Sequence, residues 1–321
     1  MPAAKAEQAL TDDHVMALIH FGEATESSRN PREFSIALPQ LSDEPRVEVW
    51  RSREPVHVDV EEGLHYASNG ELLFGHLLID EGQFNDVREA ARHAYRQVLG
   101  FLQAQEFPYL LRVWHYFPDI NRLQAGLERY QGFCVGRFEA FSATPGFENT
   151  LPAGTAIGTH APGLMFYFLA AKQPGIPVEN PRQLSAFRYQ RQHGPRSPSF
   201  SRAMLKLWGG ECSFFISGTA SVVGHETAHP HSSAQQLEET VSNLQALVAK
   251  AVERGAVGVA ALADVSPLKV YLRDPADYPF VHERLQQVIG PRNHPLYLRG
   301  DICRDALRLE IDGLLSARCE V

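Results

Sequence analysis

The sequence has few cysteines, and the motifs of the common nucleotide-binding and serine-hydrolase families are absent. Its four cysteines are far apart and form no CxxC pair, which gives no zinc-finger spacing and fits reduced thiols: Cys134, Cys212, Cys303 and Cys319. Neither a Walker loop nor a GxGxxG fingerprint is present, so nucleotide binding has no support. There is no GxSxG elbow either, which leaves serine hydrolysis without a signal.

Positive charge and long hydrophobic runs are also scarce. The 321 residues include 30 Lys and Arg against 38 Asp and Glu, and the net charge of -8 argues against a general nucleic-acid or membrane-surface binder. No apolar run is long enough to cross a bilayer, and the first residues lack the apolar core of a signal peptide. The sequence therefore predicts a cytoplasmic protein, long enough for two domains, whose partner is a small molecule rather than a nucleic acid or a membrane.

Hydrophobic periodicity predicts helices that alternate with strands. Apolar residues recurring at three and four positions indicate helices over 86–104, 123–133, 235–254 and 278–289. Apolar and β-branched runs predict strands over 47–50, 56–60, 72–79, 110–117, 134–141, 164–171 and 265–272, and a strand pair or one long strand over 212–223. Residues 1–35 are polar and irregular, and we expect a loosely packed lead-in there.

The segment 296–315 predicts two short strands broken at Arg299-Gly300-Asp301. The second strand alternates, with Leu307, Leu309 and Ile311 on one face and Arg308, Glu310 and Asp312 on the other. On an arbitrary strand a carboxylate such as Glu310 is usually solvated. Cys303 lies seven residues upstream, however, and the pair makes this segment a candidate for chemistry.

The chain contains an internal repeat. Residues 113–119, VWHYFPD, match residues 268–274, LKVYLRD, and both halves run strand, long helix, strand, short helix, strand, strand. We therefore predict an α+β fold of two β-α-β-α-β-β units, each a mixed sheet with helices packed on one face. The first unit is expected over 1–172 and the second over 206–321, with an insert at 173–205 between them. Aligning the last strands places Tyr167 opposite Glu310, so that only the second unit keeps a carboxylate there.

The insert is rich in proline and arginine. Five prolines between residues 174 and 202 exclude a long helix. Five arginines stand there against the single acid Glu179, namely Arg182, Arg188, Arg191, Arg196 and Arg202. Two interpretations are open, because a solvated loop would carry this charge without a ligand, whereas a functional loop would clamp a small anion.

Residues 225–229, HETAH, form a literal HExxH sequence. In a zinc peptidase this motif lies on a helix, so that both histidines share one face. Here a β-like run and Gly224 precede it, and Pro230 disfavours a helix at His229. The sequence therefore favours a loop at a strand end, and we predict no metal ligand. Cys212 and His225 could pair as nucleophile and base, but nothing in their spacing prefers this to a buried thiol.

Another set of residues could bind a small acid and give it a proton. Residues 217–220, SGTA, carry no bulky side chain, so a ligand could approach this backbone closely. Arg137, expected on a strand, would suit a dicarboxylate together with Arg202 and Tyr189, because guanidinium groups grip carboxylates through two hydrogen bonds. Glu310 would supply the proton if burial raised its pKa.

Several segments together resemble the chorismatase family. They are GFCVGRFEAF, LPAGTAIGT, SPSFSRA, FISGTASVVGHET and the final Cys-x6-Glu, and the resemblance spans roughly residues 105–315. The ending CRDALRLEIDGLL also resembles the closing strand of RidA-like domains. The family is built from two RidA-like units in one chain, which agrees with the internal repeat.

This resemblance implies hydrolysis of the enolpyruvyl ether of chorismate with release of pyruvate, without a metal or organic cofactor. It implies that Glu310 protonates the ether methylene. It also implies that Cys303 marks members releasing a hydroxybenzoate, 3-hydroxybenzoate or 4-hydroxybenzoate, rather than a dihydroxycyclohexadiene acid. The residues that it implies for binding the substrate are Arg137, Tyr189, Arg202, Gly218 and Ala220. HETAH is then a loop feature of the family rather than a zinc site.

Two other functions fit the same fold. A RidA-type enamine or imine deaminase would use an Arg and a Glu between neighbouring units, although the arginine-rich insert and the length of the chain count against it. A non-catalytic scaffold would bind an aromatic or keto acid as a sensor. RidA-like units usually trimerise, and two units in one chain would supply part of such a ring, so the sequence fits a monomer as well as a homo-oligomer.

Overall fold

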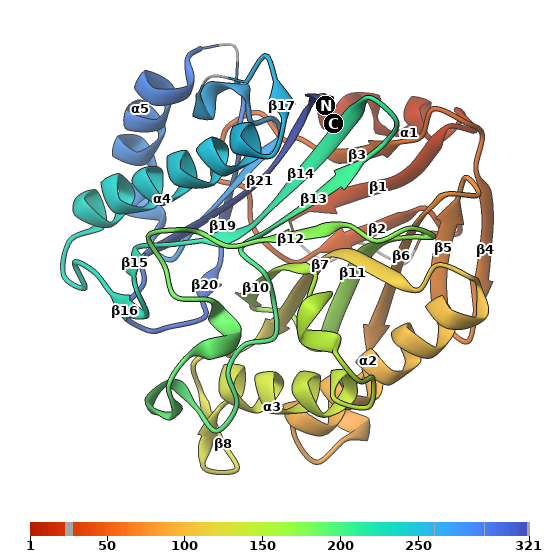
Figure 1. The fold of residues 1–321 in the computed structure, drawn as a ribbon, viewed down its shortest axis with the longest axis horizontal. Coiled ribbons are helices and arrows are strands. Elements are labelled where there is room, and N and C mark those ends of the chain that lie inside the picture. The colour runs from red at the N-terminus through yellow and green to blue at the C-terminus, as the bar shows by residue number, and fades with distance from the viewer. Residues whose placement is uncertain (23–27, 260, 292, 320–321) are drawn as a thin grey trace.

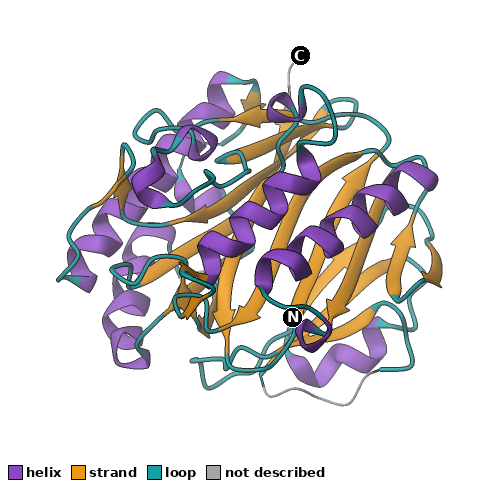
Figure 2. Cartoon of the chain, turned by 90° about the horizontal axis from the view of Figure 1, so that it is seen from below, coloured by secondary structure: helices purple, strands orange, loops and turns teal. Residues whose placement is uncertain are grey.

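Two large mixed sheets lie against each other and carry helices on their outer faces (Figure 1). The structure, a computed structural model, describes residues 1–22, 28–259, 261–291 and 293–319. Helices α2 (Val87–Ala104) and α3 (Arg129–Phe141) cover the first sheet, and α4 (Ser233–Glu253) and α5 (Tyr278–Ile289) cover the second. Figure 2 shows helices lying across one face of the strands, as the sequence predicts.

The first sheet has seven strands in the order β20-β10-β7-β11-β6-β5-β4. These are β4 (His57–Glu61), β5 (Leu64–Ser68), β6 (Leu72–Ile79), β7 (Tyr109–Pro118), β10 (Ala153–Thr159), β11 (Leu164–Ala171) and, from far along the chain, β20 (Asp301–Ile302). The second sheet follows the order β12-β13-β14-β21-β18-β19. These are β12 (Ile176–Val178), β13 (Ala203–Leu207), β14 (Glu211–Thr219), β18 (Leu268–Leu272), β19 (Leu296–Arg299) and β21 (Leu309–Cys319), with β17 (Ala256–Val257) paired to β21.

The two units have the same strand order. β4-β5-β6-β11-β7-β10 in the first corresponds to β12-β13-β14-β21-β18-β19 in the second, with α2 and α4 at one equivalent place and α3 and α5 at the other. In both units the strand before the second helix pairs in parallel with the strand that follows it. The α+β fold of two similar units that the repeat predicts is confirmed.

Three apolar layers hold this arrangement together. One lies between the first sheet and its helices, one between the second sheet and its helices, and the third between the two sheets. Each large side chain buried in such a layer stabilises the fold by about 1.5–3 kcal/mol. Because both faces of the central strands are covered, a strand such as β11 reads as a continuous apolar run rather than an alternating one.

The long helices begin close to where the sequence predicts them. The side chain of Asp86 caps α2 by accepting a hydrogen bond from the backbone N–H of Glu89. Ser232 caps α4 in the same way, through the N–H of Gln235. Within the described part of the chain, none of the helices is long and apolar enough to cross a membrane.

The first residues are not a loose lead-in, and that prediction is wrong. A short helix α1 (Ala6–Ala9) precedes a separate sheet of β1 (Val15–Phe21), β2 (Glu33–Ile36) and β3 (Glu48–Arg51) in the order β2-β1-β3. β1 is buried almost throughout, and Ile19 and Phe34 pack into the layer between the two large sheets. The run VMALIHF at 15–21 carried this signal, since a strand buried on both faces does not alternate.

Residues 134–141 belong to α3 (Arg129–Phe141), so the strand predicted there is wrong. The helix predicted over 123–133 is confirmed only for residues 129–133. Residues 123–128 form a hairpin of β8 (Leu123–Gln124) and β9 (Leu127–Glu128). Its two turn residues, Ala125 and Gly126, both have positive φ, which is typical of a tight two-residue turn. The helix then starts at a capping box formed between Glu128 and Gln131.

A glycine in the middle of α3 made this helix difficult to predict from the sequence. Gly136 lowers the helix propensity of this segment, because glycine is disfavoured in helix interiors. In the structure a Cβ at this position would overlap the backbone carbonyl of Arg88 on α2. The glycine is therefore a packing residue that lets α3 approach α2 closely.

Strand register corrects the expected equivalence of Tyr167 and Glu310. Tyr116 on β7 and Tyr271 on β18 hold matching places in the repeat, and their hydroxyl oxygens lie 3.0 Å apart between the sheets. Across the neighbouring strand Tyr116 pairs with Met165, whereas Tyr271 pairs with Glu310. Met165 is therefore the counterpart of Glu310, and the expected pairing is two residues out of register.

Candidate active site

A cavity of about 360 Å³ lies where the two units and the arginine-rich insert meet. Its walls come from α3 and β10 of the first unit, from β14 and β21 of the second, from the segment after β20, and from insert residues between 183 and 202. All seven site residues proposed from the sequence line this one cavity: Glu310, Cys303, Arg137, Tyr189, Arg202, Gly218 and Ala220. The fold thus gathers side chains that are widely separated in the sequence.

Glu310 enters the cavity from β21. Its neighbours Leu309 and Ile311 point into the core beneath α4 and α5, so the alternation of this strand turns Glu310 toward the first unit, as predicted. Its side chain is only 4% exposed. Burial, and then the negative charge of Asp312, raise the pKa of Glu310 to about 8, against the opposing pull of nearby arginines. At neutral pH this carboxyl therefore holds its proton most of the time.

Gly218 leaves the space that the acid occupies. A Cβ at position 218 would overlap the Oε1 atom of Glu310, so any larger residue there would displace the carboxyl from its place. The pairing of β14 with β21 is irregular between Ile216 and Thr219, and the backbone N–H of Gly218 instead donates to the Thr155 hydroxyl at 3.0 Å. The small residues at 217–220 therefore accommodate a side chain of the protein itself as well as bordering the cavity.

Two buried guanidinium groups face the cavity without an acidic partner. Arg137 is 2% exposed and Arg202 is 5% exposed. In the described residues neither makes an ion pair, and the Nε atom of each has no hydrogen-bond partner. Arg137 projects from α3 rather than from the predicted strand. A buried charge without a partner is costly, so this pair favours an anionic ligand in the cavity.

Aromatic rings hold these guanidinium groups in place. The ring of Phe200 lies 6.0 Å from Arg137 and 5.3 Å from Arg202, measured from each guanidinium carbon to the ring centroid. Arg202 also donates to the Tyr189 hydroxyl at 2.5 Å and to the Leu184 carbonyl at 2.9 Å. Tyr189 is thereby tied to Arg202, while the exposed Arg188 beside it does not line the cavity.

Cys303 lines the cavity as a neutral thiol. Burial, followed by the nearby Glu310 carboxyl, raises the pKa of Cys303 to about 12. A thiol with such a pKa is protonated at neutral pH and is a poor nucleophile. Its side chain also packs against the apolar residues of the first unit. Cys303 can therefore shape the cavity and make weak hydrogen bonds, but it is not suited to covalent catalysis.

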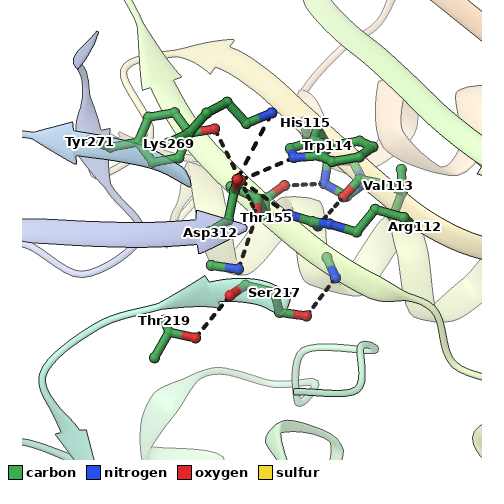
Figure 3. Close-up of polar contacts among 12 residues, drawn as sticks. Arg112, Val113, Trp114, His115, Thr155, Ser217, Thr219, Lys269, Tyr271 and Asp312 are labelled. Atoms are coloured by element: carbon green, nitrogen blue, oxygen red, sulfur yellow. Dashed lines mark hydrogen bonds and ion pairs between the residues drawn. The ribbon is translucent and has the colours of Figure 1, made fainter. Parts of the chain in front are cut away.

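A network of buried polar groups stands behind the acid (Figure 3). Asp312, on the same strand face as Glu310, accepts hydrogen bonds through Oδ2 from four side chains at 2.9–3.1 Å: Arg112, Trp114, Thr155 and Tyr271. Two of these donors come from β7 and one from β10, so the network joins the two units across their interface. The ion pair of Asp312 with Arg112 is almost fully shielded from water.

Arg304 and Thr155 are among the cavity residues that sequence reasoning missed. Arg304 donates to the backbone carbonyl of His225 at 2.9 Å and lies 5.2 Å from the centroid of the Tyr189 ring. Its place directly after Cys303 was the available signal. Thr155 lies on β10, a strand that periodicity did not reveal, because AGTAIGT is buried along its whole length and built of small residues.

The HETAH sequence does not form a zinc-peptidase site. It begins in the turn between β15 (Val222–Val223) and β16 (Glu226–Thr227) and runs through β16, and His229 then turns toward Glu239 on α4. His193, His225 and Glu226 bring three possible ligand atoms together at the cavity, and they are the residues there that could hold a metal ion. Burial, and then the charge of Arg304, lower the pKa of His193, and that same charge disfavours a second cation at this place.

Known proteins are similar to this chain in sequence and in fold. The family model described as Chorismatase FkbO/Hyg5-like, N-terminal, matches residues 48–170. A 3-hydroxybenzoate synthase from Streptomyces hygroscopicus is 35% identical over 295 residues, which cover 88% of this chain and 85% of that protein. A chorismatase from Streptomyces rapamycinicus is 36% identical over 281 residues, which cover 85% of this chain and 83% of that protein. The crystal structure of a chorismatase matches with a TM-score of 0.86 at 32% identity, covering 95% of this chain and 93% of that one.

Proposed function

This chain belongs to the chorismatase family, and we propose that it hydrolyses the enolpyruvyl ether of chorismate to release pyruvate and a hydroxybenzoate. The observation that carries this proposal is the acid in the cavity. Glu310 is buried and protonated near neutral pH, and it lines the cavity with two guanidinium groups that make no ion pair among the described residues. Chorismate offers the matching chemistry, with two carboxylates and a vinyl ether that reacts through protonation of carbon.

The reaction starts with proton transfer from Glu310. The carboxyl gives its proton to the terminal methylene of the enolpyruvyl group, a C–H bond forms from the π electrons, and Glu310 is left as a carboxylate. The positive charge on the ether carbon is shared with the ether oxygen, and addition of water then gives a hemiketal. Its collapse breaks the ether bond and releases pyruvate and the ring alcohol, and loss of water from the ring gives the hydroxybenzoate. The steps balance with water as the only co-reactant.

Arg137, Arg202 and Tyr189 are proposed to bind the substrate carboxylates. A carboxylate would supply the partner that each buried guanidinium lacks, and a charge-assisted hydrogen bond of this kind contributes about 1.5–3 kcal/mol. Tyr189 is already oriented by its bond to Arg202. The two arginines approach the cavity from α3 and from the end of the insert, which suits a ligand with an acidic group at each of two places.

The ring of the substrate is proposed to lie along Gly218 and Ala220, next to Cys303. These residues line the same cavity as the acid and offer little bulk on the β14 side. We propose that Cys303 acts after the ether is protonated, by favouring formation of a hydroxybenzoate over release of a dihydroxycyclohexadiene acid. Because one relative is a 3-hydroxybenzoate synthase, we propose 3-hydroxybenzoate as the main product of this chain, alone or with 4-hydroxybenzoate.

Product analysis tests the proposed function. Purified protein is incubated with chorismate, and pyruvate and hydroxybenzoates are separated by chromatography. Glu310→Gln keeps the shape of the acid without its proton and is expected to lower turnover by roughly 10²-fold or more. Glu253→Gln, an exposed carboxylate on α4, is the matched control and should behave as the wild type.

Three outcomes contradict the proposal. The first is a wild-type protein that leaves chorismate intact, and the second is normal pyruvate release by Glu310→Gln. The third comes from a parallel incubation with dehydroalanine-type imines. Turnover of those imines without turnover of chorismate would identify a deaminase on the same fold.

A further inference from the structure

We propose that Asp312 is a positioning residue for the acid, because its buried charge and the groups that hold it keep the Glu310 carboxyl protonated and in place over Gly218. Asp312 touches neither the cavity nor the substrate proposed for it. It acts through Glu310, so its effect on turnover rests on the proposed function. Its effect on Glu310 itself can be measured without any substrate.

Asp312 is a fixed negative charge close to the acid. It lies two residues after Glu310 on β21, hence on the same face of the strand and about 6.7 Å further along. Its side chain is 2% exposed, and one oxygen accepts the four hydrogen bonds shown in Figure 3. The Arg112 guanidinium, 3.1 Å from the same oxygen, and the Lys269 ammonium, 3.9 Å from Oδ1, are its cationic partners.

Thr155 connects Asp312 to the backbone beneath the acid. Its hydroxyl donates to Asp312 Oδ2 at 2.9 Å and accepts from the N–H of Gly218 at 3.0 Å. The Glu310 carboxyl rests where a side chain of residue 218 would otherwise stand. The position of Gly218 thus sets the position of the acid, and that position depends on a hydroxyl oriented by Asp312.

Asp312 is also the acid whose negative charge opposes ionisation of Glu310. The titratable and charged groups that face this carboxyl or its neighbour Asp312 come from several elements. They are Arg112 on β7, Tyr130 and Arg137 on α3, Arg202 before β13, Lys269 and Tyr271 on β18, Cys303 after β20 and Asp312 itself. Burial raises the pKa of Cys303 to about 12 and raises that of Tyr130 and Tyr271 well above the usual value, so these three are neutral.

The remaining groups act in opposite directions. Arg112 and Arg202 favour an ionised Glu310, whereas Asp312 opposes its ionisation and offsets the charges of Arg112 and Lys269. If Asp312 lost its charge, both guanidinium groups would draw the proton off Glu310. The acid would then be ionised, and unable to protonate the ether, over more of the neutral pH range.

The test is a titration of Glu310 in the free enzyme. Carbon-13 NMR of protein labelled at the glutamate carboxyl carbons follows each titrating group, and the Glu310 signal is identified by its loss in Glu310→Gln. In Asp312→Asn, which keeps the shape and removes the charge, the pKa of Glu310 is expected to fall by about one unit or more. The alkaline limb of the kcat/KM profile for chorismate should move down by the same amount. An identical Glu310 titration in Asp312→Asn and the wild type overturns the proposal.

A double variant covers the case in which Asp312→Asn does not fold. Arg112→Met combined with Asp312→Asn removes both charges, and replacing a buried ion pair in this way is often tolerated. Because the charge of Asp312 affects Glu310 more than that of Arg112 does, the Glu310 pKa should still lie below the wild-type value. A value equal to or above that of the wild type in the double variant also overturns the proposal.

Thr155 variants test the positional part separately. Thr155→Ser keeps the hydroxyl, whereas Thr155→Val leaves the Gly218 N–H without its acceptor, so kcat should be at least tenfold lower in Thr155→Val than in Thr155→Ser. Equal rates in the two variants would refute this part. If the Glu310 titration shifts in Asp312→Asn but the wild-type protein does not turn over chorismate, the positioning role of Asp312 is supported and the proposed function is rejected. Turnover of chorismate with an unshifted titration would do the reverse.

Discussion

The two buried arginines of the cavity, Arg137 and Arg202, lower the stability of the protein when no anion is bound. The desolvation of each guanidinium is only partly offset by the ring of Phe200 and, at Arg202, by the hydrogen bonds to Tyr189 and Leu184. An anion that binds between Arg137 and Arg202 removes this cost. Ligand binding and folding stability are therefore linked at this site.

We expect Arg202→Ala to raise the KM for chorismate by one to two orders of magnitude, since a lost charge-assisted bond costs about 1.5–3 kcal/mol. Steady-state kinetics with chorismate measures this effect. Arg188→Ala is the matched control, because Arg188 belongs to the same insert but is exposed and outside the cavity. A KM unchanged in Arg202→Ala would remove this residue from the proposed binding set.

Cys303→Ala is expected to change the ratio of products more than the rate. Its thiol is neutral and its proposed task follows the proton transfer, so pyruvate release should continue while the hydroxybenzoate share falls. Chromatography of the ring products measures the ratio. Cys212→Ala, a buried thiol outside the cavity, serves as control and should leave the ratio unaltered. The same ratio in both variants would exclude a role for Cys303 in product choice.

Residue-level reasoning from the sequence named seven residues that the structure places around one cavity. Strand alternation predicted that Glu310 points away from the core beneath α4 and α5. The arginines and the small residues at 217–220 indicated other walls of the same cavity. The remaining cavity residues could not be found in this way. Thr155 and Arg304 have no local pattern of their own, and their neighbourhood arises only when β10, the insert and the segment after β20 meet.

At the scale of elements, the close approach of α2 and α3 rests on Gly136. Gly136→Ala would place a Cβ against the backbone carbonyl of Arg88, which cannot rotate away. We expect a loss of about 1–3 kcal/mol in the free energy of unfolding, typical of overpacking. Urea denaturation measures it.

Gly100 on α2 supplies the matched control for that substitution. A Cβ there meets nothing within 4 Å, so Gly100→Ala should stabilise the protein by about 0.5–1 kcal/mol through helix propensity alone. A similar, stabilising effect at both positions would show that the helices can separate at no cost. The account of the α2–α3 packing would then be wrong.

Amphipathic elements were predictable and doubly buried ones were not. The sequence placed α2, α4 and α5 within a few residues, because each has one apolar face and a polar one. It failed at β1, β10 and α3, which are buried on more than one side and therefore lack the alternation or period on which such predictions depend. The predicted equivalence of Tyr167 on β11 and Glu310 on β21 was also wrong, because a short sequence match does not determine the register between the two repeated units.

At the scale of the whole molecule, the raised pKa of Glu310 makes stability depend on pH. The folded state holds the proton more tightly than the unfolded state, in which a glutamate titrates at about 4.3. The stability due to this group is thus fully present below about pH 4, is lost progressively as the pH rises, and is gone above a pH of about 8. Activity that needs the protonated acid should decline over the upper part of the same range.

Glu310→Gln lacks this titration, and comparison of the two proteins isolates it. The unfolding free energy of the variant minus that of the wild type should rise between about pH 4 and pH 8 and stay level on either side. Chemical denaturation at a series of pH values measures the difference. A difference that does not vary with pH would mean that Glu310 titrates normally in the folded protein.

The short strand β20 has a consequence for how such a chain can change over generations. It follows β19 of the second unit but pairs with β10 of the first, and the ion pair of Asp312 with Arg112 also crosses between the units. A recombination event that exchanged one half for that of a distant relative would break a sheet edge, a buried ion pair and the cavity at once. Although the two halves share one topology, neither can be exchanged without loss of these contacts. New product preferences are therefore accessible through point substitutions around the cavity rather than through shuffling of halves.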